Sequence, residues 1–321
     1  MMKILATMSQ ASSVDIVIPA FNAAGTIQET LDSLLGQEGI GGIFVVDDGS
    51  TDGTSDIVRR YQKNDVSLLV GSNQGVSEAR NLGAALGSSD WIIFLDADDL
   101  LVDGTVARRL EVVERTGVEI LFSDWVDFFG ESSAALAEGR RRFVDLAKLK
   151  QDQELAMATS AVWAPPAAIM SRRCLFEKVG GFRADLSIIQ DARYLFDSAR
   201  AGACFGHSGN VEAKYRVLAD SLSRSDPARF WRDVLLNGKQ IEALWREDGT
   251  LTPQRAAGVR SIYDVAGRGL LAERDPKFFE AVDALGHLAA GSSRFMKIAT
   301  AIAKVGGLGP ARYVLSSLGR L

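Results

Sequence analysis

Short apolar runs alternate with helical segments between Val14 and Asp124, and this alternation limits the possible folds more than any other feature of the chain. The runs lack the apolar–polar alternation of a half-exposed strand, so both faces of each strand should be buried. Such strands, joined by helices, form a mostly parallel sheet with helices on both faces. Strands are predicted at Val14–Ile18, Ile43–Val46, Val66–Val70, Trp91–Leu95 and Val118–Asp124, and helices at Thr26–Gly36, Thr54–Gln62, Val76–Gly87 and Thr105–Gly117.

The second half of the chain follows a different pattern. After an irregular stretch, the sequence predicts a strand followed by a helix capped by Ser171, then a helix at Gln190–Gly202 and a strand at Val211–Val217. The remaining pattern indicates helices that are interrupted at glycines. We therefore expect an α/β domain at residues 1–225 and a helical C-terminal region at residues 226–321.

Charge and cysteine content narrow the class of protein. The net charge of −5 argues against a surface built mainly to bind nucleic acid, so no nucleic-acid partner is expected. Two cysteines in 321 residues do not make a disulfide framework, which favours a reducing compartment. The N-terminus lacks the pattern of a signal peptide, and no segment is long and apolar enough to span a bilayer. A cytoplasmic location is expected, with peripheral contact at the inner face of the membrane left open. The sequence also leaves the oligomeric state open.

Polar clusters follow the first four predicted strands. Because the carboxyl ends of parallel strands meet at one edge of a sheet, where α/β proteins bind their ligands, these clusters should lie together. The clusters are "PAFN" (Pro19–Asn22), "DDGSTDGT" (Asp47–Thr54), "GSNQG" (Gly71–Gly75) and "DADD" (Asp96–Asp99).

The "DADD" cluster places carboxylates directly after an apolar strand. Asp96 and Asp98 flank one residue, so in extended chain their side chains point the same way and repel each other. A divalent cation that prefers oxygen ligands would relieve this repulsion and could also bind a diphosphate. The alternative is a solvated turn, with Asp103 capping the next helix. This segment alone favours neither interpretation.

Two further clusters allow similar alternatives. Asp47 and Asp48 could accept hydrogen bonds from a nucleobase or a ribose, or could serve a turn and a helix cap. A helix that begins at Gly75 with Arg80 one turn later suits a phosphate, although a lone Arg is also common on exposed helices.

The order of these segments carries more information than any one of them. "VIPAFNAAGTIQETLDSLLGQ", "VVDDGSTDGT", "NQGVSEARNLG", "FLDADD", "VGGF" and "QDARYLF" follow one another along the alternating pattern. In this the chain resembles the family 2 glycosyltransferases of the GT-A fold, over residues 14–223. The resemblance implies a Rossmann-like, mostly parallel sheet, with a nucleotide-binding part at about 14–125 and an acceptor-binding part at about 126–225.

The resemblance also implies roles for individual residues. Asp48, with Asp47 beside it, corresponds to the carboxylate that recognises the base. Asp96 lies near the ribose, and Asp98 binds Mn²⁺ or Mg²⁺. The loop that lines the nucleoside and the helix on the nucleotide side correspond to Pro19, Ala20, Phe21, Asn22, Gly75 and Arg80.

The chain departs from the family pattern at two positions. The family's Glu-Asp pair is Gln190-Asp191 here, which keeps Asp191 as the general base; alternatively, Asp191 is a carboxylate favoured at a helix start. Leu218 occupies the position of a histidine that lies near the metal in relatives. His207 could replace that ligand or could be structural. Without a histidine, the ligands of the metal would be Asp98, the diphosphate and water.

The acceptor side is less clearly defined by the sequence. Trp163 could stack on an acceptor sugar or could be a packing residue. By resemblance, Gly180, Gly181 and Phe182 shape the sugar pocket, with Gln190 nearby. The last predicted helix, with Phe295, Ile298, Ile302 and Val305 near one face and Lys297, Lys304, Arg312 and Arg320 as cations, could lie on an anionic membrane or could pack on protein.

The expected function is transfer of a sugar, with inversion, from a UDP-sugar to a hydroxyl of a saccharide or lipid-linked acceptor in glycoconjugate assembly. A nucleotide-sugar-binding partner with an impaired site is a second hypothesis, because Gln190 and Leu218 both depart from the pattern. A sugar nucleotidyltransferase is a third, but "PAFNAAGT" lacks the basic residue that such a phosphate loop needs.

Overall fold

The computed structural model describes residues 12–130, 137–218, 221–288 and 294–317. These residues form two compact units. The sheet unit comprises Met1–Val144, Ala164–Gly180 and Ala203–Arg216, and the helical unit comprises Asp145–Trp163, Gly181–Gly202 and Val217–Leu321. The chain thus crosses between the units several times, and the domain boundary at 225/226 stays a prediction.

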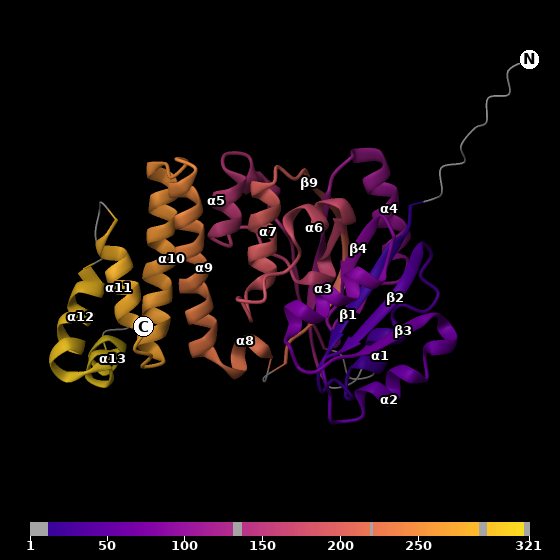
Figure 1. The fold of residues 1–321 in the computed structure, drawn as a ribbon, viewed down its shortest axis with the longest axis horizontal. Coiled ribbons are helices and arrows are strands. Elements are labelled where there is room, and N and C mark those ends of the chain that lie inside the picture. The colour runs from indigo at the N-terminus through magenta and orange to yellow at the C-terminus, as the bar shows by residue number, and fades with distance from the viewer. Residues whose placement is uncertain (1–11, 131–136, 219–220, 289–293, 318–321) are drawn as a thin grey trace, which may run out of the picture. The chain divides into compact units, whose positions relative to one another are not determined.

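The sheet unit is built on one mixed, 9-stranded sheet with the order β3-β2-β1-β4-β8-β6-β9-β5, to which β7 adds by pairing with β6. Figure 1 labels β1 to β4 and β9 of this sheet. The strands are β1 (Val14–Ala20), β2 (Ile40–Asp47), β3 (Val66–Val70), β4 (Trp91–Phe94), β5 (Leu100–Leu101), β6 (Ile120–Phe129), β7 (Ala137–Arg142), β8 (Ile169–Arg172) and β9 (Phe205–Arg216).

Strands β3, β2, β1 and β4 are parallel, as predicted from their mainly apolar, non-alternating runs. The connections run outward from β1 to β3 and then return to β4 on the other side of β1. Because crossovers between parallel strands are right-handed, the change of direction after β3 places the helix between β3 and β4 on one face of the sheet. The helix between β2 and β3 lies on the opposite face. The change of direction also makes the carboxyl end of β1 a topological switch point, where the ligand crevice of such a sheet opens. The predicted polar clusters follow the strands around this point.

The helices of the sheet unit match the predicted segments but are shorter at several ends. They are α1 (Ile27–Asp32), α2 (Thr54–Arg59), α3 (Val76–Leu86), α4 (Thr105–Thr116) and α6 (Arg173–Val179), with 3-10 turns η1 (Gln62–Asn64) and η4 (Pro166–Ala168). Two predicted caps are wrong. Ser171 lies in β8, where it pairs with β4 and β6, and α6 begins after Arg172. Asp103 is followed by Gly104, which adopts the left-handed conformation before α4.

Strand β1 extends beyond its predicted end at Ile18 and includes Pro19. Strand β1 pairs with β4 only from Val14 to Val17, and the Val17 carbonyl accepts the last bond on that side, from Leu95. Backbone groups of alternate residues point to the same side, so the missing N–H of Pro19 faces β4 beyond this last bond. The proline therefore breaks no ladder bond, and β1 continues along β2 to Ala20.

A buried ion pair fixes α4 on the sheet. Arg109 and Glu212 are both fully buried, and the Arg109 Nε donates to the Glu212 carboxylate over 3.0 Å. A second nitrogen of Arg109 donates to the Ser123 hydroxyl and to the Ala167 carbonyl, each over 2.9 Å. One guanidinium thus connects the helix with β6, β9 and η4.

The helical unit contains the remaining elements, and α9 and α10 lie side by side in it (Figure 1). Its elements are η3 (Leu146–Leu149), α5 (Gln153–Ala158), α7 (Gln190–Arg200), α8 (Leu222–Ser225), α9 (Pro227–Glu247), α10 (Pro253–Ala272), α11 (Phe278–Gly286), α12 (Arg294–Gly306) and α13 (Leu308–Ser317). Among the described residues, no helix combines the length and the apolar content that crossing a bilayer requires.

Candidate functional site

Hydrogen bonds tie together the loops that follow β1 and β2. Asn22 has a positive φ of 50°, which turns its backbone N–H toward the Ser50 hydroxyl and its side-chain oxygen toward the Thr51 N–H. The Asp48 N–H donates to the Ala20 carbonyl over 2.8 Å. The ring of Phe21 stays 50% exposed between these contacts. The predicted nucleoside loop, Pro19 to Asn22, is therefore held in place while one aromatic ring faces solvent.

Asp47 and Asp48 are both buried and organise the backbone around them. Asp47 accepts from the Ser50 N–H and the Ser55 hydroxyl, as expected for a turn residue. Asp48 Oδ1 accepts from the Gln74 N–H over 2.8 Å, and its Oδ2 accepts from the Gly75 N–H over 2.7 Å. Asp48 thus holds the start of α3 beside the end of β2, a role that the sequence did not indicate.

Arg80 and Asp96 meet, as their positions at a helix start and a strand end suggested. Arg80 is buried on α3, and its Nη2 lies 2.5 Å from Asp96 Oδ1. The Asp96 side chain is 29% exposed. This contact brings the predicted phosphate-side arginine to the first carboxylate of "DADD".

The second and third carboxylates of the cluster carry unusual acidities. Burial, and next the charge of Asp96, raise the pKa of Asp98 to about 7. Burial raises the pKa of Asp99 well above its ordinary value, and the neighbouring carboxylates add to this effect. Asp99 is fully buried and accepts a hydrogen bond from the Arg216 N–H over 2.8 Å. Its side chain therefore connects the acidic turn to the end of β9. Asp96 and Asp98 remain as the carboxylates available to a ligand at this edge.

Residues that sequence reasoning missed hold this acidic turn in shape. The hydroxyls of Thr26 and Thr30 both donate to the Ala97 carbonyl over 2.9 Å. From the other side, the Nε of Arg216 donates to the Asp98 carbonyl over 2.8 Å, and the guanidinium also donates to the Gly130 carbonyl and to Glu29. The only sequence signals were the four-residue spacing of the two threonines and an arginine in a predicted strand.

Replacing Arg216 with methionine should lower the free energy of unfolding by about 3–5 kcal/mol, because this fully buried side chain is the charged donor to Glu29 and to two backbone carbonyls. Urea denaturation followed by circular dichroism measures the loss. The matched control is Arg59→Met, because the Arg59 side chain is 53% exposed and pairs with an exposed Asp56. That control should change stability by less than about 1 kcal/mol. Equal effects of the two substitutions would contradict the role given to Arg216.

The acidic cluster fits a divalent cation only in part. Buried, mutually repelling carboxylates at a strand end are suitable ligands for Mg²⁺ or Mn²⁺. Across the described ranges of the chain, however, no group of three or more His, Cys, Asp or Glu side chains is placed to hold a metal. A cation at this place would therefore need ligands from a bound diphosphate and from water, which such ions keep readily.

His207 does not belong to the acidic cluster. It lies near the start of β9, where its Nε2 is 3.0 Å from Asp124 Oδ1, whereas Arg216, at the other end of the same strand, contacts Asp98 and Asp99. The length of an extended strand thus separates His207 from Asp98. This separation argues against its use as a substitute metal ligand.

In the helical unit, Trp163 and Asp191 form a direct contact. Asp191 lies in the first turn of α7, and the indole Nε1 of Trp163 donates to Asp191 Oδ2 over 2.8 Å. The two alternatives for Trp163 were stacking on a sugar and simple packing, and neither anticipated this bond. A hydrogen bond to one carboxylate oxygen fixes the orientation of the group.

The neighbouring predicted residues have mainly structural contacts. Phe182 is buried, and its ring centroid lies 5.1 Å from that of Tyr194 on α7. Gly180 and Gly181 both have positive φ values, 82° and 74°, and so form the turn before Phe182. Gln190 is buried at the start of α7, and its Oε1 lacks a hydrogen-bond partner among the described residues.

Asp233 of α9 holds the loop that leads into α7. Its Oδ2 accepts from the Ser187 N–H at 2.8 Å, from the Ser187 hydroxyl at 3.0 Å and from the Ile188 N–H at 2.9 Å. Beside this clamp, Phe230 and Val234 pack against the buried residues Leu186, Ile188 and Ile189. The loop ends two residues before Asp191, so α9 fixes where α7 begins.

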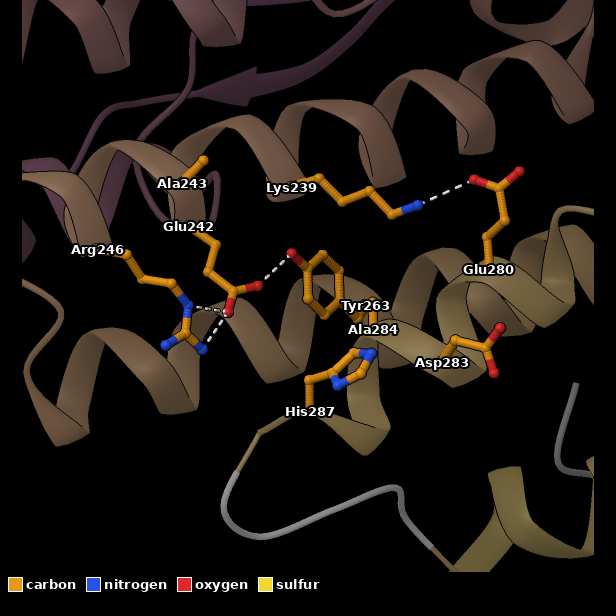
Figure 2. Close-up of a pocket in the computed structure, with 9 residues that line it drawn as sticks. All are labelled: Lys239, Glu242, Ala243, Arg246, Tyr263, Glu280, Asp283, Ala284 and His287. Atoms are coloured by element: carbon orange, nitrogen blue, oxygen red, sulfur yellow. Dashed lines mark hydrogen bonds and ion pairs between the residues drawn. The ribbon is translucent and has the colours of Figure 1, made fainter.

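A hollow of about 620 Å³ lies between α9, α10 and α11, and its lining includes none of the predicted site residues (Figure 2). Apart from Asp283, its acidic and basic side chains pair with one another. Glu242 accepts from the Tyr263 hydroxyl over 2.6 Å and from Arg246, while Lys239 donates to Glu280 over 2.9 Å. Because these ion pairs already satisfy the charges, we give this hollow no part in the reaction.

Comparison with known proteins identifies the family. The model of Glycosyl transferase family 2 matches residues 15–173. Among curated proteins, the succinoglycan biosynthesis protein ExoO of Rhizobium meliloti is 32% identical over 148 residues, which cover 45% of this chain and 41% of that protein. The uncharacterised glycosyltransferase EpsJ of Bacillus subtilis is 31% identical over 198 residues, which cover 58% of this chain and 54% of that protein. The chain thus spans about half the length of these relatives.

Solved structures agree on the fold. S. aureus TarS 1-349 in complex with UDP-GlcNAc has a TM-score of 0.65 at 16% identity, with 96% of this chain and 92% of that chain covered. The mannosyltransferase PcManGT of Pyrobaculum calidifontis in complex with GDP-Man and Mn²⁺ has a TM-score of 0.55 at 18% identity, with 97% and 88% covered. The strand order, the acidic turn after β4 and the matched segment together lead to one conclusion: the chain belongs to glycosyltransferase family 2 and has a GT-A fold.

Proposed function

We propose that the protein transfers a sugar from a nucleoside diphosphate to a hydroxyl group, with inversion at the anomeric carbon, during the assembly of a polysaccharide or another glycoconjugate. The observation that carries this proposal is the rigid acidic turn after β4, where the Ala97 and Asp98 carbonyls are bound while Asp96 and Asp98 lie at the ligand edge of the sheet. A turn that is held before the ligand arrives suits a site for a charged leaving group.

The donor-side residues take roles that follow from their positions. Phe21 offers an exposed ring to the nucleobase, and Asp48 can receive a further hydrogen bond at each oxygen. We assign Asp96, which Arg80 orients, to a ribose hydroxyl of the donor. We expect uracil as the base, and a UDP-sugar as the donor. The solved relatives were bound to UDP-GlcNAc or GDP-Man, so both classes of donor belong in the test.

A Mn²⁺ or Mg²⁺ ion, when bound, would neutralise the diphosphate as it departs, with Asp98 as the main protein ligand and Asp96 beside it. The buried carboxylate of Asp98 would thereby gain a positive partner. Because Leu218 stands in place of the family's histidine, Asp98 would supply a larger part of the protein's metal coordination.

Asp191 is the proposed general base. As the acceptor oxygen forms its bond to the anomeric carbon, the bond from that carbon to the diphosphate oxygen breaks, and the acceptor proton passes to Asp191. Trp163 positions the carboxylate through its indole N–H. The acceptor is a saccharide or a lipid-linked saccharide. Cys174 and Cys204 are exposed and free, which is compatible with the cytoplasm, where the donor would be supplied.

A panel of nucleotides tests donor binding. We expect one of UDP, GDP, dTDP and CMP, with Mn²⁺, to raise the melting temperature, with UDP the strongest. At about 100 times the Kd, the stabilisation should be about 2.7 kcal/mol. Differential scanning fluorimetry, with and without Mn²⁺, measures it. If none of the nucleotides stabilises the protein in the presence of metal, the donor-binding proposal is wrong. Binding without turnover on any acceptor would favour the impaired-partner hypothesis.

A further inference from the structure

Helices α12 and α13 pack against the helical unit with part of their surface but leave several large apolar side chains exposed. The side chains of α12 that face the helical unit include Met296, Ala299 and Ala303, and α13 adds Ala311; all four are buried. A helix that only packs on protein buries its largest apolar residues. Here, Val305 is 93% exposed and Tyr313 is 76% exposed.

The exposed residues of α12 form two adjacent stripes. Lys297 and Lys304 are seven residues apart and therefore lie on one line along the helix, and Ile298 and Val305 form the neighbouring line. All four are exposed. Arg312 and Tyr313 of α13 repeat the pairing of a cation with an apolar residue. We name these six residues the basic apolar surface. Ile302 is half-buried, and the side chain of Phe295, with Arg320, lies outside the described residues.

The charge of this surface has one sign. The sequence from Ala284 to Leu321 contains no Asp or Glu, although the whole chain has a net charge of −5. Lys297, Lys304 and Arg312 have no ion-pair partner within the described ranges. Lysines beside exposed aliphatic and aromatic side chains are typical of helices that lie in the plane of an anionic bilayer surface.

We propose that the basic apolar surface binds the surface of an anionic lipid bilayer. The cations would contact lipid headgroups, and Ile298, Val305 and Tyr313 would enter the boundary with the acyl chains. A second copy of this chain is a poorer occupant, because a twofold contact would bring like charges together. The proposal does not rest on the transferase activity, because lipid binding can be measured without donor or acceptor.

Sedimentation with vesicles tests the proposal on the full chain. The protein should sediment with vesicles made of equal parts phosphatidylglycerol and phosphatidylcholine but not with phosphatidylcholine alone, and binding should weaken as ionic strength rises. Lys297→Glu/Lys304→Glu should lower the partition coefficient at least about tenfold. Val305→Ser/Tyr313→Ser should lower it severalfold without changing the charge. The matched control is Lys63→Glu/Lys150→Glu, which makes the same charge change at exposed positions in other elements and should bind like the wild type.

Two further measurements test whether a loss of vesicle binding comes from unfolding or from a change in oligomeric state. Thermal melts of both double variants should match the wild type, because the four replaced side chains are exposed. Equal binding to neutral vesicles, or equal loss in the control variant, would overturn the proposal. So would light scattering that shows a wild-type dimer dissociated by Val305→Ser/Tyr313→Ser, since a second copy would then cover the surface.

Discussion

Replacing Asp191 with asparagine is expected to lower kcat by about 10²–10⁴-fold, because the acceptor hydroxyl loses the group that takes its proton. Asparagine has nearly the same shape and can still accept the hydrogen bond from Trp163, so the start of α7 should keep its structure. Donor binding should not change, because the proposed donor contacts come from other residues. Steady-state transfer assays and nucleotide-dependent melting shifts, measured on the same preparation, separate these two effects.

The matched control is Asp283→Asn, which removes the same charge from an exposed position on α11. It should leave both transfer and nucleotide binding unchanged. A variant at Asp191 that keeps wild-type kcat would remove this residue from the mechanism. Loss of nucleotide binding in that variant would instead indicate a structural defect.

Replacing Asp98 with asparagine should have two effects of opposite sign. It should abolish the metal-dependent part of nucleotide binding, because an amide is a much weaker ligand for Mn²⁺ or Mg²⁺ than a carboxylate. In metal-free protein, it should raise the free energy of unfolding, by an amount on the order of 2 kcal/mol at about pH 8, since repulsion with Asp96 and the cost of burying the charge both disappear.

The effect of Asp98→Asn on the free energy of unfolding should depend on pH. The pKa of Asp98 is raised from 3.8 to about 7 in the folded protein, so the folded state binds more protons than the unfolded state between these values. The contribution of Asp98 to stability therefore falls as pH rises through this window, and its full cost is present above about pH 7. The advantage of Asp98→Asn should vanish near pH 4. Urea denaturation across this range, with EDTA present, measures it.

Asp103→Asn serves as the control for this experiment, because Asp103 is exposed and follows the same acidic turn. Its stability should stay within about 0.5 kcal/mol of the wild type at every pH. If Asp98→Asn is no more stable than the wild type at high pH, the repulsion inferred for the acidic turn is absent. If its nucleotide binding still responds to metal, Asp98 is not the ligand.

The sequence predicted the sheet unit well where local pattern decides structure. Mainly apolar runs located β1 to β4, and the polar clusters after them follow parallel strands around the switch point, so the predicted fold class is confirmed. Strand β7 was missed because it comes from the basic run around Arg141, whose pairing with β6 leaves no apolar pattern. The predicted end of the first strand was too early for a similar reason. A proline is acceptable at position 19 only because the pairing with β4 has already ended there, and this pairing is not visible in the sequence.

The contacts that shape the candidate site were harder to predict, because they join distant segments. Arg216 meets Asp99 across 117 residues of sequence, and Asp233 meets Ser187 across 46. Neither arginine nor aspartate is rare in such positions, so composition and spacing gave no signal. The roles of the individual site residues, including Asp191, stay predictions until the variants are measured.

The Asp233 clamp has a consequence for how such proteins diversify. The family match ends at residue 173, whereas the proposed base and the carboxylate that fixes its loop both lie beyond that point and within one compact unit. Between Asp191 and Asp233 the chain passes through β9, whose Arg216 donates to the Asp98 carbonyl in the sheet unit. Exchange of residues 187–233 between relatives would therefore move the base, its loop and its anchor together with one support of the acidic turn. We therefore expect a chimera exchanged over this range to keep the shape of the acidic turn only if it retains an arginine at position 216.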